Sequence, residues 1–282
     1  MISLQTLVAE VKNLQPIPAV AGQLLAVAEH PDSSMADIAR VIQYDPVITA
    51  GVLRTCNSAY FGMKNPVESI KDAVNLLGID QVIELALLKS GSQALGGSQK
   101  GYGMDEGDMW RYSVSSAVLA KQVAVRLGLK GKNTIFTAAL IKDMGKIVLE
   151  KYVADAAKKI TDLVENQHFS FQEAEKKALG IDHAELGAMI AKIWKFSPRM
   201  VNIIRHHHLS DETKIADKQI AAVYLADCLS MMLGNGVGAD GLAYRFKDQV
   251  MKHLGISAVD MSMIIADFGI NMQEVETLLQ MA

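Results

Sequence analysis

The segment that most constrains the fold is 136–149, with the sequence FTAALIKDMGKIVL. It reads as an apolar helix, then the polar pair Lys142–Asp143, then a Met-Gly-Lys break and a second apolar turn. Apolar residues on nearly every side of the segment indicate that it is buried all round. A lysine and an aspartate in such a place are costly unless they pair or belong to a site. The segment therefore predicts either a structural ion pair or a reaction centre.

Composition excludes several classes of protein. The chain has 282 residues and a net charge of −3, so it carries no general basic field for nucleic acid. It holds no apolar run long enough for a membrane span, and its first residues lack the pattern of a secretory signal. Cys56 and Cys228 stand alone without CxxC spacing. They are expected to be reduced thiols in a cytoplasmic protein.

Helix signals recur along the whole chain, and strand signals are nearly absent, so we expect an all-α protein of roughly a dozen or more helices. Start signals precede most of the predicted helices. They are Asp45-Pro46, Ser170 with Glu173, Asp182 with Glu185, Ser197-Pro198, and the caps Ser257 and Asn271 of two short closing helices.

The segment 96–108, GGSQKGYGMDEGD, holds five glycines in thirteen residues. A phosphate-binding loop would need a preceding strand and ordered glycine spacing, and both are missing. The composition therefore favours a flexible linker between two helical halves.

Polar residues interrupt the apolar helices at a few other places. They are His183, the run His206-His207-His208, and Asp227. Inward-facing histidines and carboxylates from different helices are how a bundle builds a metal site. Each also has a structural alternative, since His183 can simply pack beside its helix cap and Asp227 can pair with a buried base. Adjacent helical residues point about 100° apart, so at most one or two of the three histidines can face inward.

These residues carry a resemblance to a known family. ALIKDMGKIVL resembles the L-L-H-D-[IM]-G-K-L motif of HD-superfamily metal-dependent phosphohydrolases, with Lys142 in place of the histidine. The first half is similar to the HDOD domain, a degenerate branch of that superfamily. The matching pieces of the first half are LQPIPAVAGQLL (14–25), HPDSSMADIARVIQYDPVITAGVLRTCNSAYFG (30–62) and SIKDAVNLLGIDQV (69–82). The second half continues the match with MWRYSVSSA (109–117), DHAELGAMIAKIW (182–194) and IRHHH (204–208). The helix AVYLADCLS (222–230) resembles the one that supplies the last aspartate of an HD site.

The resemblance implies a multi-helix HD/HDOD-like bundle with defined parts. The HDOD domain is expected at 10–210, with an N-terminal half at 10–95, the linker at 96–108 and an HD-like half at 109–210. A C-terminal helical extension, 211–282, is expected to pack on the HD-like half.

Departures from the family motif bear on function. An HD enzyme uses a set of His, His-Asp, His, His and Asp around one or two metals. The resemblance places Tyr112 and Lys142 at the first two histidine positions, which leaves Asp143, His183, His207 or His208, and Asp227. A protonated ammonium cannot ligate a metal. Our hypothesis is that Lys142 stands in for the metal and neutralises Asp143 or Asp227, so no catalytic residue and no cofactor is expected.

The resemblance implies a non-enzymatic bacterial signalling module in the cytoplasm that acts through contacts with signalling proteins on separate chains. Neither nucleic acid nor a membrane is an expected partner. The alternative is a residual metal-dependent phosphohydrolase acting on a nucleotide or cyclic dinucleotide, which would also make a nucleotide the ligand. In that case Fe, Mn or Zn would bind Asp143, His183, His207 and Asp227. Lysines recur between residues 142 and 177, Lys142 and Lys146 among them, and acids that include Glu175 balance their charge. We interpret this pattern as a solvated face.

Overall fold

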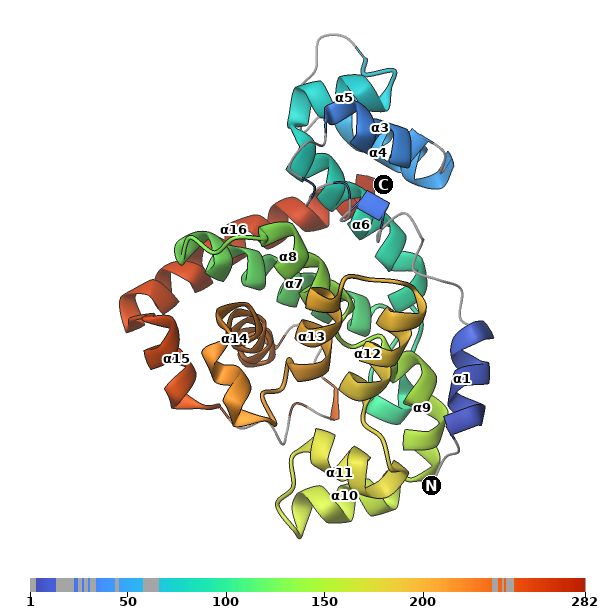
Figure 1. The fold of residues 1–282 in the computed structure, drawn as a ribbon, viewed down its shortest axis with the longest axis vertical. Coiled ribbons are helices and arrows are strands. Elements are labelled where there is room, and N and C mark those ends of the chain that lie inside the picture. Colours follow the sequence, from blue (N-terminus) through green and yellow to red (C-terminus); the bar gives the residue numbers. More distant parts are fainter. Residues whose placement is uncertain are drawn as a thin grey trace. The chain divides into compact units, whose positions relative to one another are not determined.

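The structure is a computed structural model that describes residues 4–13, 34–43, 46–57, 66–234 and 246–281, with residues 23, 24, 27, 30, 238, 239 and 241 besides. The described residues form helices joined by turns and contain no β-strand (Figure 1). Their β-pairing is limited to an isolated bridge between Gln99 and Met104. The all-α class predicted from the sequence is confirmed.

The chain divides into two compact units. The smaller unit is formed by Pro16–Ala94 together with Gly269–Ala282. Its helices before residue 95 are α3 (Met35–Gln43), α4 (Pro46–Cys56), α5 (Ile70–Leu77) and most of α6 (Ile79–Leu95). Helices α3, α4 and α5 pack against one another through apolar faces that include the buried Ile38, Val52 and Val74.

The larger unit, Met1–Gln15 with Leu95–Phe268, contains the 136–149 segment. Its centre is α14, which packs on α7 and α8, while α13 packs on α8 and α12 packs on α9 and α13 (Figure 1). Its elements are α1 (Leu4–Asn13), the 3-10 helix η1 (Lys100–Tyr102), α7 (Asp108–Arg126), α8 (Lys132–Ile141), α9 (Gly145–Asp155), α10 (Ala157–Glu165), α11 (Phe171–Leu179), α12 (His183–Ile193), α13 (Pro198–His206), the 3-10 helix η2 (Glu212–Ala216), α14 (Lys218–Met232), α15 (Asp248–Leu254) and the start of α16 (Ala258–Met281).

Local sequence signals explain where several helices of the larger unit begin. Ser170 and Glu173 form the predicted capping box of α11, and Ser197 caps α13 with Pro198 in its first turn. Asp182 caps α12 by accepting the Glu185 N–H. The second half of that predicted box is replaced, because the Glu185 carboxylate pairs with Lys176 instead.

The glycine-rich segment 96–108 is packed, and the prediction of a flexible linker there is wrong. Tyr102 is fully buried, and Gly101 lies so close to α9 that a Cβ would meet the Glu150 carbonyl oxygen at 2.3 Å. Its glycines serve close packing and turns such as Gly103, which has φ +67°. Composition alone does not separate these uses from chain freedom.

The two predicted closing helices are a single helix, α16. Ser257 caps it as expected, with its hydroxyl accepting the Asp260 N–H. Asn271 lies inside the helix, where an asparagine costs only a few tenths of a kcal/mol in propensity and does not end a helix. The end of the matching piece 30–62 lies, beyond Asn57, outside the described residues.

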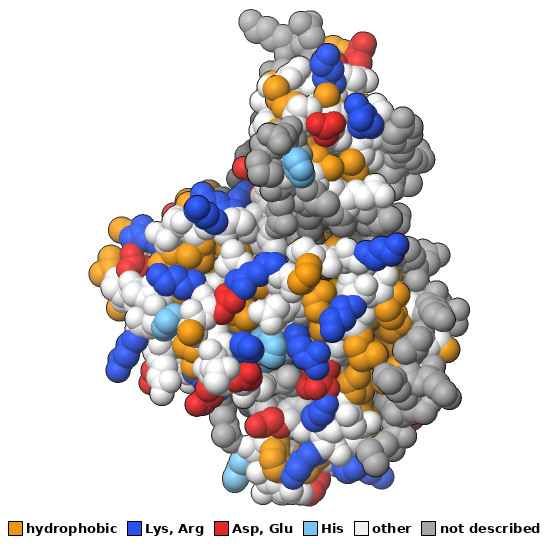
Figure 2. All heavy atoms as spheres, in the orientation of Figure 1, with side chains coloured by type: hydrophobic (Ala, Val, Ile, Leu, Met, Phe, Trp, Pro, Cys, Tyr) orange, Lys and Arg blue, Asp and Glu red, His pale blue; other side chains and the backbone are white. Residues whose placement is uncertain are grey.

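Charged side chains on the face drawn in Figure 2 are mixed in sign. Several charged side chains of the larger unit pair, as Arg199 does with Asp217 at 2.5 Å and Arg205 with Glu185 at 3.8 Å. Among the described residues no single helix has the length and apolar character to cross a membrane. One pair, Asp248–Leu254 with Ala258–Ile270, meets that criterion only together and is bent by 93°.

Candidate functional site

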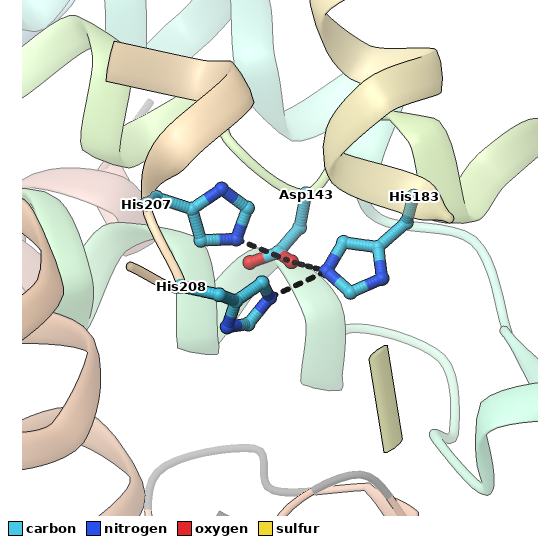
Figure 3. Close-up of side chains that lie close together, drawn as sticks. All are labelled: Asp143, His183, His207 and His208. Carbon is cyan, nitrogen blue, oxygen red and sulfur yellow. Dashed lines mark hydrogen bonds and ion pairs between the residues drawn. The ribbon is translucent and has the colours of Figure 1, made fainter. Parts of the chain in front are cut away.

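All seven side chains that the sequence singled out meet inside the larger unit. They come from elements far apart in the chain: Tyr112 from α7, Lys142 and Asp143 from the turn after α8, His183 from the start of α12, His207 and His208 from the turn after α13, and Asp227 from α14. Figure 3 shows Asp143 with the three histidines around it. Of the histidine run, His207 and His208 join the cluster, which agrees with the expected limit of two.

A glycine brings the two halves of this cluster together. Gly145 begins α9, and a Cβ on it would lie 2.1 Å from the His183 carbonyl oxygen and 2.9 Å from the Gly187 N. The start of α9 can therefore approach the start of α12 only because residue 145 has no side chain. The Met-Gly-Lys break in the sequence is a packing requirement.

We expect Gly145→Ala to lower the free energy of unfolding by about 1–3 kcal/mol, since backbone atoms must move apart. Urea denaturation measures this change. The control is Gly269→Ala in α16, where a Cβ meets nothing within 4 Å and alanine should stabilise by about 0.5–1 kcal/mol. Equal effects of the two substitutions would contradict the close approach.

Lys142 bridges the two buried aspartates. Its Nζ contacts Asp143 Oδ2 and lies 2.7 Å from Asp227 Oδ1, and all three side chains are at most 2% exposed. The Tyr112 hydroxyl donates to the same Asp227 oxygen at 2.6 Å, and the Tyr112 ring lies 4.4 Å from Lys142 Nζ. Tyr112 thus supplies a hydrogen bond to the carboxylate and an aromatic face to the ammonium.

The other oxygen of Asp143 faces a different set of groups. Asp143 Oδ1 lies 3.1 Å from Lys146 Nζ, 3.5 Å from His183 Nε2 and 3.8 Å from His207 Nε2. One donor atom from each of Asp143, His183, His207 and His208 falls within 4.8 Å of the others. The Asp143 carboxylate therefore faces the Lys142 ammonium at Oδ2 and faces the Lys146 ammonium together with two imidazoles at Oδ1, which is called the imidazole side below.

Hydrogen bonds on the outer nitrogens set which way the imidazoles present their lone pairs. His207 Nδ1 donates to the Ile204 carbonyl at 2.7 Å, so its Nε2 carries the lone pair. This Nε2 is buried and has no hydrogen-bond partner among the described residues. His183 Nδ1 donates to Glu175 Oε2 at 2.6 Å, and its Nε2 lies 2.7 Å from His208 Nε2.

Burial and neighbouring charges shift the pKa values of the cluster in opposite directions. Burial raises the pKa of the Asp143 carboxyl, but the ammonium groups of Lys142 and Lys146 outweigh it and hold that pKa well below its usual range. The pKa of Asp227 is lowered in the same way, with Lys142 outweighing burial. Both aspartates are therefore carboxylates at neutral pH.

The histidines differ among themselves. Burial lowers the pKa of His207 to about 4, and burial together with the neighbouring imidazoles holds the pKa of His208 well below its ordinary value. Burial also acts to lower the pKa of His183, but Glu175 outweighs it and the net shift is upward. His207 and His208 are therefore neutral donors at pH 7, and His183 is the histidine that takes up a proton most readily.

Charge within the cluster is close to balanced. Two buried ammonium groups, Lys142 and Lys146, face three buried carboxylates, Asp143, Asp227 and Glu175. A protonated His183 brings the sum to zero. Such compensation is what allows so many ionised groups to lie in a core.

The donor chemistry on the imidazole side fits one divalent transition metal ion. Imidazole nitrogens and a carboxylate oxygen are typical ligands. Bonds of about 2.0–2.1 Å allow ligand atoms up to about 4.2 Å apart, so the four donor atoms, which lie within 4.8 Å of one another, would draw together on binding. The unpartnered, buried Nε2 of His207 is a lone pair that such an ion would satisfy. The group that could hold an ion differs by one member from the set expected from the sequence, because His208 offers a ligand atom there, whereas Asp227 is held by Lys142 and Tyr112.

Two buried groups of the cluster were not predicted from the sequence. Lys146 and Glu175 were interpreted as parts of a solvated face, and this is wrong because both are buried at the cluster. Lys146 is the second lysine of the KDMGK motif, and this position could have indicated that it belongs to the site. Glu175 lies on α11 among exposed charges, so only the fold shows that it faces His183.

The chain is similar to a known protein family and to a curated protein. The HDOD domain family model matches residues 14–210, more than half of the chain. The chain therefore belongs to the HDOD domain family. An uncharacterized protein of Treponema pallidum (strain Nichols) is 23% identical over 200 residues, which are 70% of this chain and 38% of that protein. The chain thus spans about two fifths of the length of the curated relative it matches.

Solved structures share the fold. An HDOD domain protein with unknown function from Geobacter sulfurreducens has a TM-score of 0.72 at 23% identity, over 98% of this chain and 97% of that one. A protein from Shewanella amazonensis named "Putative phosphohydrolase" has a TM-score of 0.70 at 24% identity, over 98% of both chains. A "Putative signal transduction protein" from Marinobacter aquaeolei has a TM-score of 0.70 at 20% identity, over all of this chain and 61% of that one. At these identities the likeness shows the fold alone.

Proposed function

We propose that this chain is a non-enzymatic regulatory module of a signalling system, acting through protein–protein contacts with signalling proteins on separate chains. The observation that carries the proposal is the position of Lys142 Nζ between the carboxylates of Asp143 and Asp227. In this proposal a fixed ammonium stands where the family's enzymes place a metal ion. The name of the Marinobacter aquaeolei structure is in line with a signalling role for the fold.

Two departures from the HD motif complement each other, and this supports the proposal. The ammonium of Lys142 needs carboxylates and a π-face, and Tyr112 provides the π-face while it also donates to Asp227. A histidine at either position would not complete this arrangement. The two residues therefore form one structural unit around Asp227.

The imidazole side argues for a closed site. Its donors are Asp143, His183, His207 and His208, and a tetrahedral ion with four protein ligands has no open position for a reacting water. A bound ion with an open position would supply Lewis acidity and lower the pKa of a bound water. At this site the protein holds the imidazoles of His183, His207 and His208 in place and excludes water from the Asp143 carboxylate.

The second candidate is a residual metal-dependent phosphohydrolase acting on a nucleotide or cyclic dinucleotide. The observation in its favour is the unpartnered Nε2 of His207 beside Asp143. Mn²⁺ or Fe²⁺ accepts more ligands than a tetrahedral ion and would leave positions open.

A phosphoester assay separates the two functions. The wild-type chain is incubated with phosphomonoesters, nucleotides and cyclic dinucleotides in the presence of added Mn²⁺, Fe²⁺ or Zn²⁺. We expect no turnover above that of the ions alone. Turnover that Asp143→Ala abolishes and Asp162→Ala, at an exposed carboxylate, leaves intact would support the hydrolase instead.

A further inference from the structure

Tyr102, in the glycine-rich segment, reaches the cluster from outside the family motif. Its side chain is fully buried, its ring lies 5.7 Å from that of Phe171, and its hydroxyl donates to Glu175 Oε1. No sequence feature marked this tyrosine as part of a site. Its burial against a carboxylate requires an explanation, because a tyrosine hydroxyl in a core needs a partner.

Glu175 links Tyr102 to His183. One of its oxygens accepts the Tyr102 hydroxyl, and the other accepts both the His183 backbone N–H at 3.1 Å and the His183 Nδ1–H at 2.6 Å. The carboxylate is thus held from both sides. A carboxylate fixed in this way allows the imidazole a single orientation, with Nε2 turned toward Asp143.

Gly101 fixes the segment that carries Tyr102. Its backbone N–H donates to Glu150 Oε1 at 3.3 Å, and its missing side chain permits contact with the α9 backbone. Two neighbouring residues therefore anchor the segment, one on α9 and one on Glu175. Since α9 also carries Lys146, the segment and the cluster share a support.

We propose that Tyr102 is a positioning residue for the imidazole side of the cluster. Through Glu175 it holds His183 in the orientation that binds a divalent metal ion together with Asp143, His207 and His208. Outer hydrogen bonds of this kind typically change metal affinity 10–100-fold when they are removed. The inference does not depend on whether the chain hydrolyses a phosphoester, so the assay above and the titration below can fail independently.

Linkage makes the relation reciprocal. If the packing of segment 96–108 raises affinity for the ion, then the bound ion stabilises the packing of that segment by the same factor. Binding of an ion would therefore stabilise the packing of a segment that directly follows α6 in the chain. Ion binding and the order of this segment are two readouts of one coupling.

Titration with Co²⁺ tests the proposal, because its absorption spectrum reports the ligands around it. We expect the metal-free wild type to bind Co²⁺ with a spectrum typical of nitrogen and oxygen ligands, and Tyr102→Phe to bind it about tenfold more weakly. The control is Tyr152→Phe, which removes a hydroxyl that donates to Glu10 at 2.8 Å, and it should match the wild type within about twofold.

Amide hydrogen exchange gives the second readout. Co²⁺ should slow exchange in segment 96–108 of the wild type and have little effect there in Tyr102→Phe. If that variant does not fold, Glu175→Gln takes its place, since it keeps the side-chain shape and weakens the bond to His183. Unchanged Co²⁺ affinity in the folded variant, or a wild type that binds no Co²⁺, would overturn the proposal.

Discussion

Replacement of Lys142 by alanine should lower the free energy of unfolding by about 3–5 kcal/mol. The ammonium contacts Asp143 and lies 2.7 Å from Asp227 Oδ1, and all three side chains are buried. Its removal leaves two carboxylates close together, with the Lys146 ammonium beside Asp143 and the Tyr112 hydroxyl beside Asp227. The loss is large because the desolvation of the aspartates persists after their counter-charge is gone.

Urea denaturation of the wild type and Lys142→Ala measures this effect. The control is Lys151→Ala, at an ion pair with Glu10 whose lysine is 56% exposed, and its effect should be much smaller because solvent screens such a pair. Comparable losses in the two variants would mean that the buried bridge is not the support we infer. The phosphoester assay is expected to give no turnover for either variant.

Acidification should destabilise the protein through the buried histidines His207 and His208 before the carboxylates of Asp143 and Asp227 are protonated. Burial lowers the pKa of His207 to about 4 in the folded chain, whereas an unfolded histidine titrates near 6.5. The unfolded state therefore binds more protons between these values, and stability falls as pH decreases through that window. From about pH 7.5 to about pH 5 the loss attributable to His207 is about 2 kcal/mol.

The variant His207→Asn removes this contribution and should show a correspondingly shallower fall of unfolding free energy over the same pH range. The exposed His253→Asn serves as the control and should keep the wild-type slope. His183 acts in the opposite sense, because its pKa is raised and its contribution is lost as pH rises above about 6.5. A wild-type stability that is flat between about pH 5 and 7.5, with an equal slope in His207→Asn, would contradict the assignment.

Asp143 and Asp227 act at lower pH. Their pKa values lie below the ordinary range in the folded chain, so their contribution is present above about pH 4 and is lost as pH falls further.

Local signals in the sequence were sufficient for much of this site. The polar pair inside 136–149 predicted either a buried ion pair or a reaction centre, and the cap residues Ser170 and Ser197 predicted where α11 and α13 begin. The family motif named the seven positions that the fold brings together. Each of these inferences rests on residues close in sequence.

What failed depends on contacts between distant segments. Glu175 has the neighbours of a surface residue in the sequence, and it is buried in contact with Tyr102 and His183, which come from other segments of the chain. Glycines in 96–108 give the same composition whether they free a chain or let it pack closely, as Gly101 does against Glu150. Such uses of a residue become visible only in three dimensions.

The role of Tyr112 was likewise hidden. A tyrosine in place of a ligand histidine reads as a simple loss, but in the fold it donates to Asp227 and faces the ammonium of Lys142. The two replacements compensate for each other because both act on one carboxylate.

The central claim, that the Lys142 ammonium occupies the place of a metal ion, is tested most directly by anomalous scattering from crystals soaked in Mn²⁺. We expect no anomalous peak between Asp143 Oδ2 and Asp227 Oδ1, with Lys142 Nζ found there, and any bound ion on the Oδ1 side among the imidazoles. A manganese ion seated between the two carboxylates, with Lys142 displaced, would contradict the claim.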